Sequence, residues 1–106
     1  MENSKKQYIY IIKPIPRLLD ENNWTDEDRA AIGRHVEALE KYKSEGRLIL
    51  AGRTQTLNEK TFGIVIVEAG SEDEAYSMMI NDPAVKEGLM TAELYPYKVA
   101  IMADMR

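Results

Sequence analysis

Two segments of the chain carry apolar residues on both alternating faces of a predicted strand. They are QYIYIIK at residues 7–13 and FGIVIVE at residues 62–68. Because successive side chains of a strand point to opposite faces, a sheet built from such strands is apolar on both sides. Helices can cover one side. A chain of 106 residues has nothing left to cover the other except a second copy, so the sequence predicts a homodimer with sheets packed face to face.

The other segments predict one α+β domain over residues 1–106 with a ferredoxin-like fold. The expected order is β-α-β-β-α-β, in which an antiparallel four-stranded sheet carries two helices on one face. Thr25 is the expected N-cap of the first helix, and Ser71 with Glu74 forms the expected capping box of the second. The predicted elements are a strand at 7–13, a loop at 17–24, a helix ending at Ser44, strands at 47–52 and 62–68, a helix from Ser71 to Asp82-Pro83, a helical turn at 84–88 and an extended segment at 90–102.

Charge and composition argue against several classes of function. The net charge is -4 and the Lys and Arg residues are scattered, so the basic stripe typical of nucleic-acid binding is missing. The chain has no cysteine, one histidine and no glycine-rich phosphate loop, so we expect no metal and no cofactor. No run approaches the roughly 20 apolar residues that cross a bilayer, and no apolar signal region follows the polar start. We therefore expect a cytoplasmic protein with no membrane contact.

His35, the single histidine, lies on the first predicted helix, one residue before Val36. The apolar stripe of that helix runs through Ile32, Val36 and Leu39, so the sequence places the imidazole on the flank of the stripe. One interpretation is a half-buried histidine bonded to a backbone carbonyl. The other is a general acid or base, because an imidazole exchanges protons near neutral pH.

Asp82 precedes Pro83 at the end of the second predicted helix. The residue before a proline is pushed out of helical geometry, so one interpretation of Asp-Pro is a helix terminator. A carboxylate beside an imidazole fixes its tautomer and stabilises its charged form, so the second interpretation is a dyad with His35. The spacing along the chain leaves both interpretations open.

Between His35 and Ala100 the chain resembles the YCII-related family. The resemblance rests on the combination of an H-x-x-x-L helix, "EGRLILAG", "FGIVIVEA", "SEDEA", "NDPAVKEGL" and "LYPYKVAI", and it extends less specifically to "YIYIIKP" in the first strand. It implies a dimeric α+β barrel and an active site made of a histidine and an aspartate, at positions that match His35 and Asp82. Two departures affect this site: Ala84 stands where the family's DPF motif has an aromatic, and "RLLDENNWTDED" is inserted before the helix.

Together, the resemblance and the chemistry of the pair predict an enzyme that moves protons on a small acidic or aromatic-derived molecule, as an isomerase or an elimination lyase does. His35 and Asp82 are its expected catalytic residues. The expected substrate-binding residues, around a pocket at the side of the barrel, are Arg53, which can pair with a carboxylate, Arg17 and Trp24 at the pocket mouth, and Tyr10 on the first strand; Lys86 is expected to be a solvated charge. The alternatives are a non-catalytic module that binds a small metabolite and a structural homo-oligomer.

Overall fold

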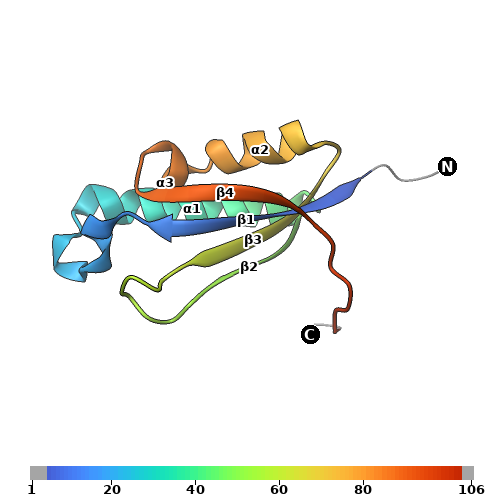
Figure 1. Ribbon diagram of the computed structural model, residues 1–106. Helices are drawn as coiled ribbons and strands as arrows, with labels where there is room; N and C mark the ends of the chain where they lie inside the picture. Colours follow the sequence, from blue (N-terminus) through green and yellow to red (C-terminus); the bar gives the residue numbers. More distant parts are fainter. Residues whose placement is uncertain (1–4, 104–106) are drawn as a thin grey trace.

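Four antiparallel strands form one sheet in the order β2-β3-β1-β4 (Figure 1). The computed structural model describes residues 5–103. This strand order with two main helices confirms the predicted ferredoxin-like α+β fold. The elements are β1 (Lys6–Pro14), two short 3-10 turns, η1 (Pro16–Leu19) and η2 (Glu21–Asn23), α1 (Asp26–Ser44), β2 (Leu48–Arg53), β3 (Gly63–Ala69), α2 (Glu72–Ile80), α3 (Pro83–Lys86) and β4 (Met90–Tyr97).

The main core lies between one face of the sheet and the helices. In the β1–β3 register Tyr8 pairs with Val67 and Tyr10 with Val65, so these side chains share one face. The buried cluster on that face also contains residues of α2, and Leu39 and Tyr42 of α1 pack against it. Its buried members are Tyr8, Tyr10, Ile12, Val65, Val67, Ala69, Ala75, Met78 and Met79.

The opposite face, which we call the open sheet face, is also apolar, as the sequence predicts. Ile9 pairs with Ile66 on β3 and with Tyr95 on β4. Every second residue along each strand points to this same face. Ile66 is buried, whereas Tyr95 remains 44% exposed. The apolar side chains of the open sheet face are Ile9, Ile11, Leu50, Ile64, Ile66, Tyr95 and Tyr97. No helix covers them in the described chain, because the helices pack on the other side (Figure 1).

Both main helices begin at the predicted N-caps. The Thr25 hydroxyl accepts a hydrogen bond from Asp28 N–H while the Asp28 carboxylate accepts one from Thr25 N–H, which is a complete capping box. Ser71 Oγ likewise accepts from Glu74 N–H, but the Glu74 carboxylate accepts from Gly70 N–H rather than from Ser71 N–H. Ser71 and Glu74 therefore both stabilise the start of α2, but Glu74 accepts its hydrogen bond from the residue before the N-cap.

Two local predictions differ from the structure. Residues 17–24 form the turns η1 and η2 instead of an irregular loop, because side-chain hydrogen bonds close the segment on itself. The last strand ends at Tyr97, so residues 98–102 were wrongly assigned to it. Within residues 5–103, the helices are all too short or too polar to cross a membrane.

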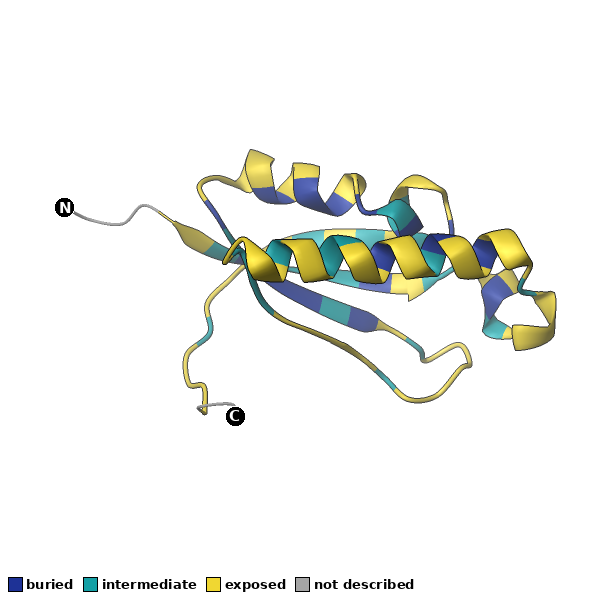
Figure 2. Ribbon diagram, turned by 180° about the vertical axis from the view of Figure 1, so that it is seen from behind, coloured by how far each residue is buried: buried dark blue, intermediate teal, exposed yellow. Residues whose placement is uncertain are grey.

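The buried stripe of α1 is also rotated from the predicted one. Val36 is 51% exposed, whereas the neighbouring His35 is buried together with Ala31. Figure 2 shows these buried positions as short dark segments along a helix that is otherwise largely exposed. The prediction followed the apolar residues, but the buried side of α1 includes polar residues that find partners in the fold. The imidazole consequently lies on the buried side of the helix and not on its flank.

Candidate functional site

His35 and Asp82 meet between α1 and α3. The His35 Nδ1 atom lies 2.7 Å from Asp82 Oδ1 and 2.8 Å from Asp82 Oδ2. The Asp82 side chain has no exposed surface, and that of His35 is 11% exposed. These residues are 47 positions apart in the sequence. The fold therefore holds a carboxylate and an imidazole in direct contact, away from bulk water.

The Asp-Pro pair places the carboxylate. Pro83 is the first residue of α3, where its missing N–H and fixed φ are tolerated. Asp82 is the N-cap of this short helix, and its Oδ2 atom accepts a hydrogen bond of 3.0 Å from Ala84 N–H. Asp82 thus follows the end of α2, begins α3 and presents its carboxylate to His35. The sequence predicted that a helix ends at Asp82-Pro83, but not that Asp82 caps a further helix through Ala84 N–H. A proline at the first helical position, directly after an aspartate, is the pattern that indicates such a cap.

The contacts of His35 define which of its ring nitrogens is available. When Asp82 is ionised its carboxylate only accepts hydrogen bonds, and Nδ1 then carries the proton that is donated to it. In the neutral imidazole, Nε2 then has a free lone pair. Among residues 5–103, no hydrogen-bond partner is found for Nε2. This arrangement suits a group that takes up a proton at Nε2 while the carboxylate stabilises the resulting positive charge.

Tyr10 brings a second polar group to the buried region around Asp82. Among residues 5–103, its hydroxyl is the buried side-chain polar atom without a hydrogen-bond partner. Burial is the largest of the causes that raise the pKa of Tyr10 above its ordinary value. The negative charge of Asp82 raises it further, and the electrostatic interaction with Tyr42 adds a smaller increase. The hydroxyl therefore stays protonated and can donate a hydrogen bond. Helical spacing places Tyr42 on the same side of α1 as His35, and its pKa is also raised, first by burial.

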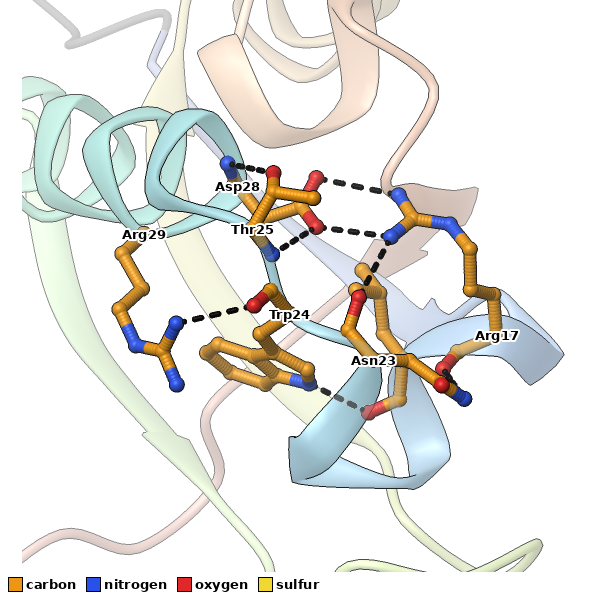
Figure 3. A network of polar contacts seen from close by, with 7 residues as sticks. Arg17, Asn23, Trp24, Thr25, Asp28 and Arg29 are labelled. Atoms are coloured by element: carbon orange, nitrogen blue, oxygen red, sulfur yellow. Dashed lines mark hydrogen bonds and ion pairs between the residues drawn. The ribbon is translucent and has the colours of Figure 1, made fainter.

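Arg17 and Trp24 belong to a separate network that folds residues 17–24 onto the start of α1 (Figure 3). The Arg17 guanidinium donates two hydrogen bonds to the Asp28 carboxylate, of 2.7 and 3.0 Å. This bidentate contact is the main cause that holds the pKa of Asp28 well below its usual range. Trp24 Nε1 donates to Leu18 O at 2.8 Å, and the Arg29 guanidinium lies 5.8 Å from the indole centroid. The polar groups of Arg17 and Trp24 are therefore engaged within the chain.

The remaining predicted residues lie on the surface. Arg53 is exposed at the end of β2, with a 3.4 Å contact from its Nη1 to the adjacent Thr54 carbonyl. Lys86 is exposed on α3, as a solvated charge would be. A surface hollow of about 460 Å³ lies where the chain leaves β4, and another of about 390 Å³ lies between α2 and β4. Neither His35 nor Asp82 lines these two hollows. Within residues 5–103, no group of three or more metal-binding side chains is found.

The match to known proteins covers nearly the whole described chain. The sequence model of the YCII-related domain matches residues 7–98. The chain belongs to the YCII-related family. Its fold is similar to that of 5-chloro-2-hydroxyhydroquinone dehydrochlorinase from Burkholderia phenoliruptrix AC1100, solved in complex with 2,5-dihydroxybenzoquinone, with a TM-score of 0.65 and 25% sequence identity. The similarity covers 87% of this chain and 93% of that one. Among curated proteins, no sequence matches this chain.

Proposed function

We propose that this YCII-related protein is a small-molecule enzyme that uses His35 and Asp82 for acid–base proton transfer. The observation that carries the proposal is the buried 2.7 Å contact between His35 Nδ1 and the Asp82 carboxylate, which leaves Nε2 for the substrate. The buried carboxylate depends on His35 and on Ala84 N–H to offset its desolvation, so the fold holds the imidazole and the carboxylate in a fixed geometry. The reaction class is an isomerisation or an elimination.

In the proposed step, Nε2 takes a proton from a C–H or O–H group of the substrate. The bonding electrons left behind form a new π bond. In an elimination, a leaving group departs with its own electron pair; in an isomerisation, the imidazolium returns the proton to another atom of the same molecule. Asp82 stabilises the imidazolium in both cases and holds its ring in place. Asp82 is therefore the orienting residue and His35 the group that touches the substrate.

The proposed substrate is small and acidic or derived from an aromatic ring. The similar solved protein supports this class, since its name describes loss of hydrogen chloride from a chlorinated hydroxyhydroquinone and its structure holds a dihydroxybenzoquinone. Tyr10 is the proposed donor to an oxygen of such a substrate, because its protonated hydroxyl lacks a partner among residues 5–103. Arg53 remains a proposed carboxylate contact, since its guanidinium is exposed and its single hydrogen bond within residues 5–103 is long. We leave Arg17 and Trp24 out of the proposed site because Asp28 and Leu18 already engage them.

The proposed functional unit is a homodimer joined through the open sheet face. Seven apolar side chains on this face, three of them 40–44% exposed, continue across all four strands. An apolar sheet face of this extent is a common interface, and a second copy presents an identical surface to it. Sedimentation velocity at micromolar concentration is expected to give the mass of two chains. A single-chain mass at that concentration would remove this part of the proposal.

A specific observation favours a second candidate, a structural or metabolite-binding role. The Asp82 side chain is fully buried, and neither surface hollow reaches the pair. In that case the His35–Asp82 contact serves to join α1 to α3, as the exposed Arg34–Glu87 ion pair of 2.7 Å also does. A binding module is expected to be stabilised by its ligand without forming a product.

The deciding experiment compares wild type with His35→Gln and Arg34→Gln on hydroxyhydroquinones with and without a ring chlorine. Absorbance follows the change in the ring, and an ion electrode follows chloride release. We expect His35→Gln to lower kcat by about 10²-fold or more, the usual contribution of a general base. Arg34→Gln breaks a contact between the same two helices but should change kcat less than about twofold. Full turnover in His35→Gln on any substrate that wild type converts would contradict the proposed role.

A further inference from the structure

The chain after β4 carries large apolar side chains that its own fold does not cover. Residues 98–103 read KVAIMA and lie outside the sheet. Ile101 is 94% exposed and Met102 is 62% exposed, which makes them the two most exposed large apolar residues of the described chain. Figure 1 shows this segment turning away from the end of β4 and from α2. We call residues 98–103 the C-terminal arm.

The arm leaves the domain on the side of the open sheet face. Its anchoring contact is a 2.7 Å hydrogen bond from Val99 N–H to Gln7 Oε1. Gln7 pairs with Glu68 and Tyr97 and alternates with Tyr8, so its side chain shares the open sheet face with Ile9. A hollow of about 460 Å³, lined by Tyr97 and Val99 among other residues, remains at the base of the arm. The base of the arm is thus held on the side of the open sheet face, while Ile101 and Met102 stay exposed.

We propose that the arm of each chain packs Ile101 and Met102 against the margin of the open sheet face of a second copy, beside the part of that face that the facing sheet covers. This inference rests on the homodimer proposed above and adds an exchanged segment to it. Two sheets that meet face to face bring the base of each arm, Tyr97, to the edge of the shared interface. Six extended residues span up to about 20 Å, enough to reach across several strands spaced about 4.8 Å apart. Burying these two exposed apolar side chains of each chain supplies the driving force.

The position of the arm is tested in mixed dimers. One chain carries ¹³C-labelled isoleucine methyl groups; the other is unlabelled and carries a nitroxide on Ala103→Cys, which is a unique attachment site because the chain has no cysteine. We expect the nitroxide to broaden the methyl signals of Ile9, Ile11 and Ile64 in the partner, and to leave that of Ile80 on α2 unchanged. Broadening only when label and nitroxide share one chain would show that the arm folds back on itself, and would overturn the exchange.

The contribution of the arm to association is tested by sedimentation equilibrium of the double variant Ile101→Asp, Met102→Asp. We expect its dimer Kd to rise at least tenfold. The matched control is Val36→Asp, which places the same charge on an exposed apolar residue of α1 and should leave the Kd within twofold. An unchanged Kd in the double variant, with wild type dimeric, would overturn the arm proposal alone. A monomeric wild type would overturn the homodimer and the arm together.

Discussion

Asp82→Ala is expected to destabilise the fold more than any surface substitution on the same two helices. The change removes the acceptor of the buried His35 Nδ1–H, and an unsatisfied buried donor costs about 1–3 kcal/mol. It also removes the side-chain cap on Ala84 N–H, worth about 1 kcal/mol. The free energy of unfolding should therefore fall by about 2–4 kcal/mol. For a chain of this length, that corresponds to a loss in Tm of roughly 10–20 °C.

Two variants separate the buried pair from the general effect of a substitution at this helix junction. Asp82→Asn keeps one acceptor oxygen for either His35 or Ala84, so it should cost roughly half as much as Asp82→Ala. Glu87→Gln breaks the Arg34–Glu87 ion pair, whose side chains are 49% and 45% exposed, and should cost at most about 0.5 kcal/mol.

The assay is urea unfolding at one fixed protein concentration, followed by the fluorescence of Trp24. This residue is the single tryptophan, and it packs against a smaller apolar cluster formed by Leu18, Ala31 and Leu89. The linear dependence of the free energy on urea gives each difference from the shift in midpoint. The reasoning is refuted if Asp82→Ala lies within about 0.5 kcal/mol of wild type, the usual range for surface substitutions, or if Glu87→Gln is equally costly.

Three further predictions follow from other contacts. Tyr10→Phe removes a buried hydroxyl without a partner among residues 5–103, so urea unfolding should show a gain of about 1 kcal/mol, whereas kcat on a substrate that wild type converts should fall. Arg17→Gln should destabilise the fold at pH 7, because Arg17 lowers the pKa of Asp28 in the folded state. The difference in stability from wild type should persist above about pH 4, the ordinary carboxyl value, and should shrink as the pH falls towards the lower folded pKa. Urea midpoints measured from pH 7 to 2 follow this loss. Ser71→Ala removes the N-cap of α2 and should cost about 1 kcal/mol, whereas Ser77→Ala within the helix serves as its control.

The sequence determined the order of the elements and the limits of the first helix. Thr25 and Ser44 bound α1 as predicted, because caps and helical periodicity act over about four residues. The two-faced pattern of β1 was also readable, since alternation along a strand is a local property. The end of β4 was not readable, because Val99 N–H finds the side chain of Gln7 instead of a neighbouring strand, a contact between residues 92 positions apart.

The tertiary structure decided which side of α1 is buried and which charged residues meet. Apolar spacing favoured Val36, yet His35 is buried because Asp82, the N-cap of α3, lies where it accepts a hydrogen bond from the imidazole. Arg17 was expected near a pocket, but Asp28 engages its guanidinium. These outcomes depend on residues brought together from distant parts of the chain. A side chain with several chemically suitable partners is assigned to one of them only by packing, because burial and distance set the energy of each contact.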